Sequence, residues 1–481
     1  MTIRRLGNTP RIRETDYSRF ASSYPNALAS LIPIRREWQS RLQKLARLSH
    51  KRQHHAVRQL LRARHLYPLF AFDALKSCKR LGGASPETVV ALANRFDPFN
   101  PVTDERVVLR DAARSTSRSR IVCDFGPIRR MHQQVVDAIL RNLHPLLENQ
   151  FLFNGGMPKA LSAIEAAISA GNHYSCELDF VGFYGSVVVD DLAEVTRPLP
   201  NSISQHVVWD EHLRFNDHLF VTLSSLRSDP TPEPPSGLYL GSASSPIVGE
   251  ILISRLLADA QLGDIITYAD NLCVLGRSEE EVTARITSLR DAINASPLRC
   301  VSGLRVTHKP IRNVFEGKPS VSGVEFSSHR AITRRNRETA SIRVSGWQPT
   351  FDKIAQYQIG AAEYVSVDDL NTAITKVSNW KRYYSSWPDG DLFEAEYLAW
   401  LKARRFLERG TPEHKASAIA AVVNAHLMHD SGERGDLRYR DFLPGLRTVA
   451  ETELDQAIQE RLNIILNSRT RQRSTPTIQD W

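Results

Sequence analysis

The sequence has no long apolar run and no pattern of paired cysteines. No window approaches the ~18 consecutive apolar residues of a transmembrane helix. The opening stretch MTIRRLGNTPRIRETDYSRF carries charge without an apolar segment behind it, so we expect no secretory signal. The five cysteines are scattered without a CxxC pair, which disfavours zinc fingers and a disulfide scaffold. These absences predict a soluble, cytoplasmic protein with reduced thiols.

Acidic residues are outnumbered by basic ones. The 481 residues include 62 Lys and Arg against 53 Asp and Glu, which gives a net charge of +9 and a pI near 9.3. The hydrophobic share of 42% is enough for a sizeable packed core. A basic balance favours a polyanionic partner, nucleic acid before an anionic membrane surface. Net charge alone is equally consistent with a basic protein that has no such partner.

One segment is particularly short of acids. Between Arg35 and Arg64 there are ten Lys and Arg residues and a single acid, Glu37. Its apolar residues form a broken helical stripe: Leu42, Leu45, Leu48, Val57, Leu60 and Leu61. A solvated helix normally mixes both signs, so the segment is predicted to be a helical arm that faces nucleic acid. An ordinary basic surface is the alternative.

Further elements are expected from periodicity and end signals. Helices are predicted at Met131–Leu147, Pro158–Ala170, Ile247–Ala260 and Glu279–Ala295. Ser278 is expected to be the N-cap of the last of these. Residues 176–189 change to a strand-like period, and residues 264–275 indicate a β-hairpin. Beyond about Ser345 the chain is expected to be helical, ending in a disordered tail.

Two isolated aspartates each follow an apolar strand. Asp179 lies in CELDFVGFYG and Asp270 in IITYADNLCVLG, with a Gly/Ser-rich turn and an apolar helix between them. On adjacent strand ends, two carboxylates can bind two Mg²⁺ ions, which clamp the attacking and leaving oxygens of an in-line phosphoryl transfer. The alternative is that an isolated Asp after a strand is a cap or turn residue. Asp190 and Asp191 precede LAEV and are expected to cap a helix.

In order and spacing these segments resemble the palm of a reverse transcriptase, of the bacterial group II intron, retron and abortive-infection kind. LDFVGFYGSV resembles motif A, GLYLGSASSP motif B, and YADN the YADD box of motif C. LRVTHKP resembles the motif D segment and includes Lys309, and SVSGVEF resembles the primer grip with Gly323. SRIVCDFGPIRRMHQQVV resembles the fingers segment that meets the triphosphate, with Arg120 as the better match and Arg129 or Arg130 next. The resemblance covers roughly residues 115–330 and consists of several weak motifs in the right order.

The resemblance implies an α+β fold of the right-hand polymerase type, with fingers, a palm built on an antiparallel sheet, and a helical thumb and C-terminal region. The domains expected on this basis are a basic helical N-terminal arm (1–84), fingers (85–175), palm (176–330), a helical thumb and C-terminal region (331–467) and a disordered tail (468–481).

The resemblance also implies roles for individual residues. The metal ligands would be Asp179, Asp270, the backbone carbonyl of Phe180, and Asn271. They would hold two Mg²⁺ ions, with Mn²⁺ as an alternative. Lys309 would protonate the leaving group. The substrate-binding set would be Arg120, Arg129, Tyr184, Leu240, Gly241 and Ser242. Tyr184, five residues after Asp179, would lie under the sugar and disfavour a 2′-hydroxyl.

Two positions depart from the family pattern. Motif C has Asn271 where a second Asp is usual, and this keeps an oxygen donor but loses a charge. Motif B has Leu240 where Gln is usual and Tyr239 where Pro is usual. Losing the Gln contact should cost on the order of 1 kcal/mol of nucleotide positioning.

The implied function is RNA-directed DNA polymerase activity (a reverse transcriptase) that adds dNTPs to a primer 3′-hydroxyl. No HNH-type or zinc-finger-like nuclease signature follows residue 345. A stand-alone bacterial enzyme of anti-phage defence is therefore expected, working with a non-coding RNA or an unusual template. The partners would be an RNA template or non-coding RNA, a DNA product and dNTPs, but no membrane; a partner protein or a homo-oligomer is left open. Two alternatives also stay open: a catalytically weakened RNA-binding scaffold and an RNA-dependent RNA polymerase.

Overall fold

A computed structural model describes residues 14–112, 120–210, 213–215, 237–314, 324–335, 342–350 and 383–384. The chain forms two compact units. The first consists of residues 1–164 and 177–310, and the second of residues 165–176 and 311–481. Within the described helices, no 18-residue window is apolar enough to cross a bilayer.

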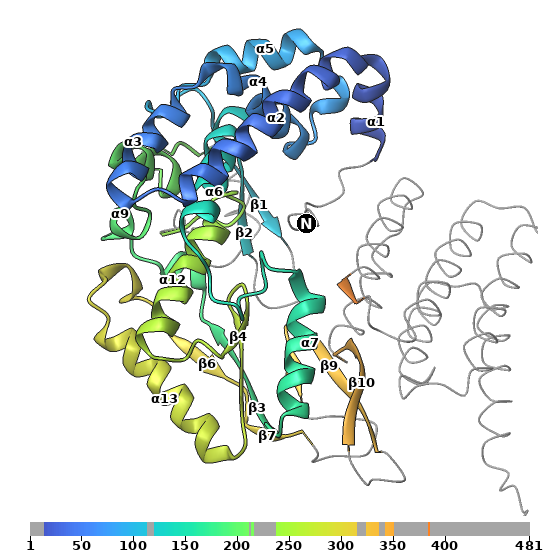
Figure 1. Cartoon of the computed structure of the whole chain (residues 1–481), viewed down its shortest axis with the longest axis vertical. Helices are drawn as coiled ribbons and strands as arrows, with labels where there is room; N and C mark the ends of the chain where they lie inside the picture. Colours follow the sequence, from blue (N-terminus) through green and yellow to red (C-terminus); the bar gives the residue numbers. More distant parts are fainter. Residues whose placement is uncertain are drawn as a thin grey trace, which may run out of the picture. The chain divides into compact units, whose positions relative to one another are not determined.

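Helices and strands alternate irregularly along the chain (Figure 1). The helices are α1 (Glu14–Ser23), α2 (Pro25–Ala46), α3 (His50–Leu61), α4 (Tyr67–Ser77), α5 (Pro86–Arg95), α6 (Pro127–Leu143), α7 (Gly156–Ser169), α8 (Phe183–Ser186), α9 (Leu192–Val195), α10 (Asn201–Ile203), α12 (Ser245–Asp259) and α13 (Glu279–Ala295). Shorter 3-10 or π-helical turns are η1 (Arg64–Leu66), η2 (Leu81–Gly83), η3 (Ser204–Val208) and η4 (Arg299–Val301). The strands are β1 (Val108–Ala112), β2 (Arg120–Asp124), β3 (Tyr174–Phe180), β4 (Ile266–Tyr268), β5 (Asn271–Gly276), β6 (Val306–His308), β7 (Arg312–Asn313), β8 (Glu325–Phe326), β9 (His329–Arg335) and β10 (Ile342–Pro349).

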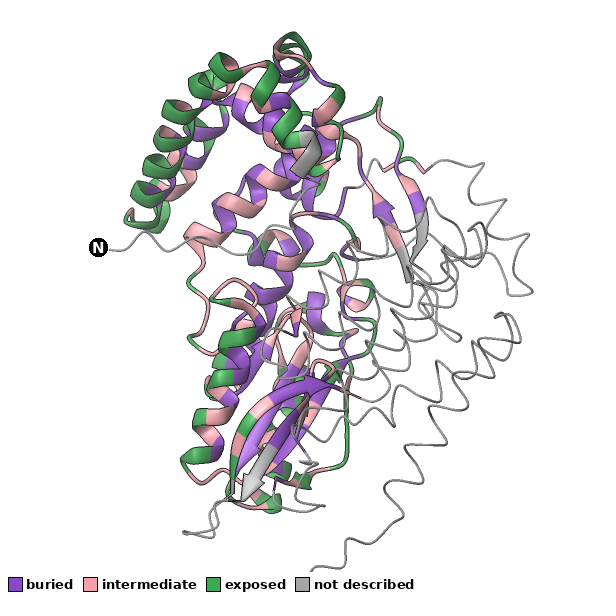
Figure 2. Ribbon diagram, turned by 90° about the vertical axis from the view of Figure 1, so that its right-hand side faces the viewer, coloured by how far each residue is buried: buried purple, intermediate pink, exposed green. Residues whose placement is uncertain are grey.

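The N-terminal helices of the first unit bury one face each. The predicted apolar stripe is confirmed on α2 and α3 by five buried residues, Leu42, Leu45, Val57, Leu60 and Leu61, while Leu48 is half-buried. The outer faces of these helices are exposed in Figure 2. Helix α4 is almost entirely buried and packs against α5 and α6. Aromatic side chains join the layer, with ring centroids 4.8 Å apart for Trp38 and Phe70 and for Tyr67 and Phe96.

The main sheet has the strand order β4-β5-β3-β6, and β7 also pairs with β3. The pairs β4–β5, β3–β6 and β3–β7 are antiparallel. Side chains of a strand alternate between faces. Cys176, Leu178 and Phe180 of β3 are accordingly buried, while Asp179 is exposed on the other face. Helix α13 packs on β5, and α12 contacts both α13 and α6.

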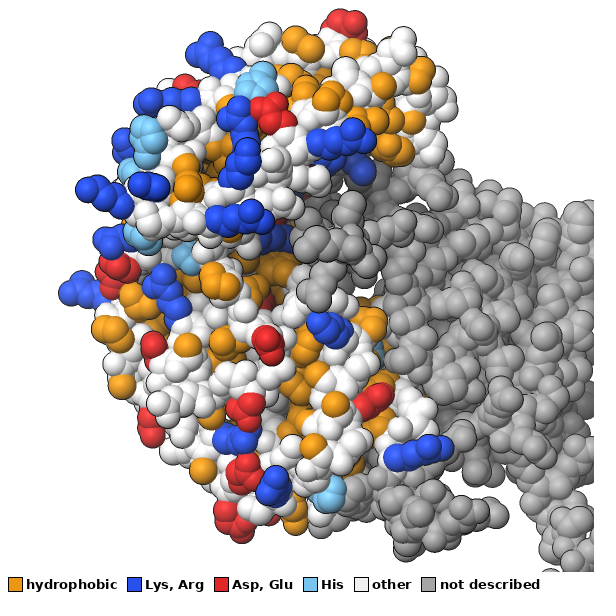
Figure 3. Space-filling model, in the orientation of Figure 1, with side chains coloured by type: hydrophobic (Ala, Val, Ile, Leu, Met, Phe, Trp, Pro, Cys, Tyr) orange, Lys and Arg blue, Asp and Glu red, His pale blue; other side chains and the backbone are white. Residues whose placement is uncertain are grey.

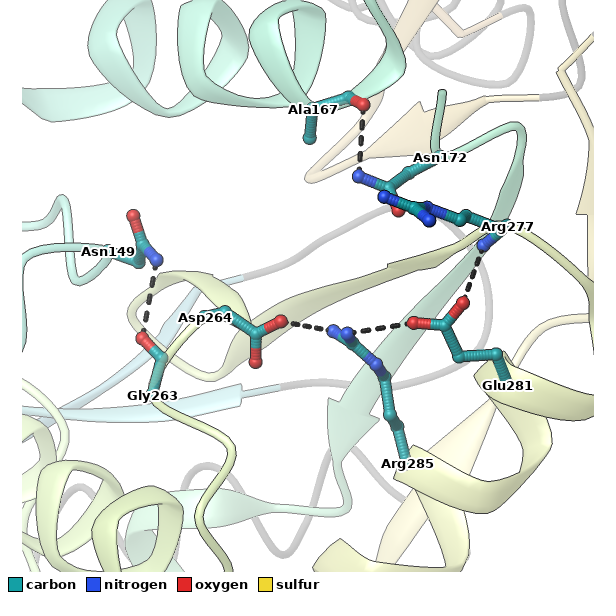
Figure 4. Close-up of polar contacts among 8 residues, drawn as sticks. All are labelled: Asn149, Ala167, Asn172, Gly263, Asp264, Arg277, Glu281 and Arg285. Atoms are coloured by element: carbon teal, nitrogen blue, oxygen red, sulfur yellow. Dashed lines mark hydrogen bonds and ion pairs between the residues drawn. The ribbon is translucent and has the colours of Figure 1, made fainter. Parts of the chain in front are cut away.

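Helix α13 begins where the sequence predicted. The Ser278 hydroxyl accepts a hydrogen bond from the Glu281 amide at 3.3 Å, so the predicted N-cap is confirmed. Such a cap contributes about 1 kcal/mol to helix stability. Figure 4 shows the first turns of this helix, where Arg285 bridges Glu281 and Asp264, which lies two residues before β4. The helix is thereby tied to the β4–β5 hairpin.

In the second unit, β8, β9 and β10 form an antiparallel sheet in the order β10-β9-β8. The buried Trp347 of β10 donates from Nε1 to Glu165 Oε1 of α7 at 2.8 Å. The prediction that residues from 331 onward are helical is therefore wrong for β9 and β10. The alternation of apolar and polar residues in IRVSGWQP suits a strand better than a helix.

The fold is a mixture of helices and antiparallel sheets, as expected from the sequence. The boundaries drawn at 84, 175, 330 and 467 stay predictions. Most of the region assigned to thumb and tail lies outside the described residues, as does Gly323.

Candidate active site

The first acid of the candidate site stands at the end of β3. Asp179 is exposed, and its register partner on β6 is Thr307, whose hydroxyl donates to the Asp179 carbonyl at 3.3 Å. The next residue, Phe180, turns its side chain into the core at 2% exposure. Alternation along the strand therefore anchors the backbone through Phe180 and directs the carboxylate to the opposite face.

The second acid stands on the tight turn between β4 and β5. Tyr268 pairs with Asn271 in the ladder, so Ala269 and Asp270 are the two central turn residues. Ala269 has a φ of 53°, which is unusual for a residue with a side chain. The Phe180 amide donates to the Asp270 carbonyl at 3.4 Å. This contact brings together the strand ends that carry Asp179 and Asp270.

The donor set fits a hard divalent cation. The two carboxylates lie on neighbouring strands. Asn271 turns its Nδ2 toward Asp270, at 3.4 Å from Oδ1, and its amide oxygen is a further group of the kind that such a cation accepts. Across the described ranges, no group of three or more His, Cys, Asp or Glu could hold a metal ion. A Mg²⁺ ion held by two carboxylates would complete its shell with water and substrate phosphates.

Lys309 follows β6 directly and lies beside β3. Its Nζ is 2.6 Å from Glu177 Oε2, and its amide donates to the Glu177 carbonyl at 2.9 Å. Glu177 and Asp179 are two residues apart on one strand and therefore share a face. The lysine is half-exposed on the face of the sheet that carries Asp179.

Tyr184 lies on α8, immediately after the strand end. The neighbouring Phe183 ring packs where α12 has Gly249, since a Cβ there would lie 2.7 Å from Phe183 Cε1. Burial raises the pKa of the Tyr184 hydroxyl, and the nearby carboxylates of Asp270 and Glu250 raise it further. The phenol is thus neutral at physiological pH and lies near α12 and the β4–β5 turn.

The motif B turn is held from two sides. The Cys123 amide of β2 donates to the Leu240 carbonyl at 2.8 Å, and Arg130 Nη1 donates to the Gly241 carbonyl at 2.8 Å. Gly241 has a φ of 95°, and a Cβ there would lie 2.2 Å from the Cys123 carbonyl oxygen. Ser242 is buried, with its hydroxyl 3.1 Å from that of Ser244. Gly241 and Ser242 therefore shape the turn, while Leu240 is half-buried.

Tyr239, the other unusual motif B residue, turns toward the β1–β2 hairpin. It packs against a small apolar cluster formed by Val107, Leu109, Cys123 and Phe125. Its ring centroid is 6.4 Å from that of Phe125. The substitution for Pro thus gives the turn an apolar anchor on the hairpin.

The candidate arginines of the fingers segment have different environments. Arg120 begins β2, opposite Ala112 of β1. Arg129 is 2% exposed; its guanidinium forms an ion pair with Asp210 and hydrogen bonds to the carbonyls of Val102 and Glu105. These contacts give Arg129 a structural role inside the fold, so it lacks the access to a triphosphate that the sequence prediction required. Arg130 is the neighbour that reaches the motif B turn.

Asp191 stands at the N-cap position of α9, as predicted, but its side chain does not cap that helix. Its Oδ2 instead accepts from the Arg299 amide at 3.0 Å. The predicted capping bond is therefore wrong, and the acid joins α9 to η4. The φ of 64° at Asp191 explains the difference, since an N-cap side chain reaches the helix amides from the β region.

Sequence reasoning missed a buried acid next to the site. Glu250 of α12 is 1% exposed, and burial raises the pKa of its carboxyl to about 8. Gln150 Nε2 donates to Glu250 Oε2 at 3.0 Å. The available signal was an acid in the middle of the otherwise apolar run PIVGEILI.

No protein-family model matches this chain, and no curated protein matches it either. Among solved structures, the chain is similar to a telomerase from Candida albicans in complex with the TWJ fragment of telomeric RNA. The TM-score is 0.31 and the identity 9%, over 72% of this chain. The alignment spans 66% of the telomerase chain, just under two thirds of its length. At that TM-score the likeness supports no conclusion about the function of this chain.

Proposed function

We propose that this protein is an RNA-directed DNA polymerase that extends a primer 3′-hydroxyl with dNTPs. The observation that carries the proposal is the adjacency of Asp179 and Asp270 on neighbouring strand ends, joined by the bond from the Phe180 amide to the Asp270 carbonyl. Paired carboxylates in this arrangement suit two-metal nucleotidyl transfer. The ordered motifs around them supply the resemblance to reverse transcriptases, with fingers, palm and thumb as the expected domains.

The remaining roles follow from this assignment. Asp179 and Asp270 would hold two Mg²⁺ ions, or Mn²⁺, with the Phe180 carbonyl and the Asn271 amide oxygen as further donors. Ions bound there would activate the primer hydroxyl and stabilise the charge that develops on the transferred phosphoryl group. Arg120 and Arg130 would neutralise the triphosphate. Lys309 would leave Glu177 to protonate pyrophosphate.

Tyr184 supports dNTPs over NTPs as substrates. From α8, its ring extends to Gly249 of α12 and lies near Asp270. A bulky side chain at this point would clash with a 2′-hydroxyl on the incoming nucleotide. This argument favours DNA synthesis over an RNA-dependent RNA polymerase.

Primer extension by the purified full chain tests the proposal. Asp179→Asn and Asp270→Asn should each lose incorporation by at least 100-fold while the unfolding temperature is retained, because each removes a metal-bridging charge. Asp291→Asn is the matched control, since Asp291 is an exposed carboxylate on α13, away from the site. Extension at the wild-type rate by both site variants would refute the assignment.

The same assay separates the alternatives. Incorporation of NTPs in preference to dNTPs would identify an RNA polymerase. Absence of any incorporation, with RNA binding intact, would favour an RNA-binding scaffold, for which the Asn271 and Leu240 substitutions are the supporting observation.

The biological setting is proposed from the family resemblance alone. A role in anti-phage defence with a non-coding RNA predicts that sequencing of the co-purifying nucleic acids returns one structured RNA, extended into DNA when dNTPs are added. Recovery of random cellular RNA would speak against it.

A further inference from the structure

A carboxyl group is buried behind the candidate active site. Glu250 is 1% exposed on α12, a helix whose other buried residues are mostly apolar. Burying a polar group without partners costs several kcal/mol in an apolar environment. We therefore expect the Glu250 side chain to have a hydrogen-bond partner and a role in the molecule.

Gln150 is the partner of Glu250. This residue is fully buried, and its Nε2 donates both to Glu250 Oε2 at 3.0 Å and to the Glu250 carbonyl at 2.9 Å. Its own Oε1 accepts from the Leu147 amide at 3.0 Å. The amide group is therefore held at both ends, which gives the pair a single geometry.

The segment around Gln150 grips the strand that leads to the catalytic turn. The Thr267 amide of β4 donates to the Asn149 carbonyl at 2.8 Å, and the Phe151 amide donates to the Thr267 carbonyl at 2.9 Å. Figure 4 shows Asn149 also donating to the Gly263 carbonyl just before that strand, at 3.2 Å. A continuous set of bonds thus runs from α12 through Gln150 to β4.

The turn at the end of β4 needs such support. Ala269 has a φ of 53°, a backbone conformation that costs a residue with a side chain on the order of 1 kcal/mol. A strained backbone conformation persists where the surrounding contacts hold it in place. The Ala269 amide lies close enough to the Glu250 carboxyl to lower its pKa, so the turn lies beside the buried acid. Within the described residues, Glu250 Oε1 accepts no hydrogen bond.

We propose that Glu250 and Gln150 are positioning residues that clamp the β4–β5 turn and thereby aim the Asp270 carboxylate at the reacting centre. The inference rests on the proposed function, because it assigns Asp270 to catalysis. The clamp acts through Ala269 and Thr267 and touches neither nucleotide nor primer.

The chemistry of the clamp is that of a neutral hydrogen-bonding group. Burial raises the pKa of the Glu250 carboxyl to about 8, with the nearby Asp270 charge raising it as well. The acid is therefore mostly protonated at neutral pH, and a Gln side chain has nearly the same shape and no charge. Glu250→Gln should consequently retain the clamp, whereas Glu250→Ala removes it.

A double-mutant cycle in the full chain tests this. Glu250→Ala should lower kcat for primer extension by about 10- to 100-fold, since misplacing a catalytic group by about 1 Å has effects of this size. The concentration of Mg²⁺ for half-maximal rate should rise with it, while the KM for dNTP changes less than threefold. Glu250→Gln should stay within about threefold of the wild type.

Ala269→Gly distinguishes a positioning role of Glu250 from a purely structural one. Glycine adopts positive φ without strain, so the turn no longer needs the clamp. The loss caused by Glu250→Ala should therefore shrink at least fivefold in the Ala269→Gly background. If Glu250 only stabilised α12, Glu250→Ala would lower the unfolding temperature equally with and without Ala269→Gly. Its effect on kcat would then not depend on the residue at position 269. Where Glu250→Ala does not fold, Gln150→Leu carries the same test, because it removes the donor and keeps the volume.

Hydrogen exchange separates this inference from the proposed function. In the metal-free protein, amides of residues 266–273 should exchange faster in Glu250→Ala than in Glu250→Gln, and those of β3 should not change. Equal exchange in the two variants, or a cycle without coupling, would overturn the clamp. Faster exchange in a chain whose wild type incorporates no nucleotide would overturn the polymerase and leave the clamp in place.

Discussion

At the scale of single residues, Asn271 shows how one substitution changes both charge and hydrogen bonding. Its Nδ2 donates to Asp270 Oδ1 at 3.4 Å, so an amide stands where the resembled family has a second carboxylate. A carboxylate at this position would repel Asp270 in the absence of metal and would attract a second cation in its presence.

Asn271→Asp should therefore raise the extension rate in Mg²⁺ relative to that in Mn²⁺, by several-fold at limiting metal. The rates of both proteins would be measured across titrations of each metal. Asn271→Ala is the matched variant, because it removes the amide donor without adding charge. Superimposable curves for wild type and Asn271→Asp would mean that residue 271 takes no part in the metal chemistry.

His132 makes a second residue-scale prediction, this time about stability. Its ring is 4% exposed, lies 4.7 Å from the Phe96 ring, and has no hydrogen-bond partner for either nitrogen in the part of the chain that the structure describes. Burial, with smaller contributions from the charges of Arg129 and His206, lowers the pKa of His132 to about 3, while Asp97 acts in the opposite direction. The folded state thus binds fewer protons than the unfolded state between about pH 3 and 6.5.

Stability should consequently fall as the pH falls through this window, by about 2 kcal/mol from pH 7 to pH 5 on account of His132 alone. His132→Phe removes that dependence and keeps an aromatic ring against Phe96. Urea unfolding at pH 7, 6 and 5 measures the difference between the two proteins. Parallel pH curves would show that His132 does not titrate as the burial requires.

The arginines of α6 explain why site residues were only partly predictable. Arg129 and Arg130 are neighbours in sequence, but successive residues on a helix point about 100° apart. One side chain is therefore buried against Asp210, and the other reaches Gly241. Spacing within a motif identifies the helix but cannot say which of two adjacent arginines faces the site, because the facing direction depends on how the helix packs.

At the scale of elements, local signals predicted several of the helices that the structure describes, but not α1, α4 or α5. Ser278 and the acids after it mark the start of α13. The apolar periodicity predicted the ends of α6 and α12 to within a few residues. The α12 prediction nevertheless missed the role of Glu250, because its partner lies 100 residues away in the chain. The strands β9 and β10 were missed because strand pairing depends on a partner segment, which the local sequence does not identify.

The basic arm on α2 and α3 is an element-scale feature. Figure 3 shows Lys and Arg side chains gathered over the part of the surface where these helices lie. Within the described residues, Arg35 pairs with Asp73 and Arg41 with Glu37, while the exposed Lys51 and Arg52 have no carboxylate within ion-pair distance. The face therefore keeps an excess of positive charge that suits a phosphate backbone.

Lys51→Glu together with Arg52→Glu tests the arm without weakening the helix. Both residues lie in the first turn of α3, where acids interact favourably with the helix dipole. RNA affinity should fall, and the slope of log K against log salt should decrease in magnitude by about 1.4 if both residues neutralise a phosphate of single-stranded RNA. Arg290→Glu, on the exposed face of α13, is the control for a charge reversal outside the arm. An unchanged slope would assign the arm to ordinary surface.

At the scale of the whole molecule, the first unit depends on contacts between segments far apart in the chain. Arg130 and Gly241 are 111 residues apart, yet their hydrogen bond joins α6 to the motif B turn. The Cys123 amide binds the Leu240 carbonyl beside it, and Tyr239 packs on the β1–β2 hairpin. Motif order indicated that these segments belong to one site. Their contacts could not be predicted, because nothing in either segment alone specifies its partner.

Gly241 is the point at which this long-range joint can be tested. An Ala there would meet two penalties: a φ of 95°, and a Cβ 2.2 Å from the Cys123 carbonyl oxygen. Gly171 has nearly the same φ, 98°, but no atom within 4 Å of the corresponding Cβ. Gly171→Ala therefore carries the backbone strain alone, about 1–2 kcal/mol. Gly241→Ala should lose about 3 kcal/mol or more, because the clash also breaks the bond between Cys123 and Leu240.

The two variants should differ in activity as well as in stability. Urea unfolding would rank them, and primer extension below both unfolding midpoints would show whether the motif B turn still serves the site. Gly171→Ala should extend primers like the wild type, whereas Gly241→Ala should lose at least tenfold in rate, because β2 and the motif B turn can no longer meet. Equal losses of stability in the two variants would mean that strain at positive φ accounts for the whole effect. The contact between β2 and the motif B turn would then make no contribution of its own to stability.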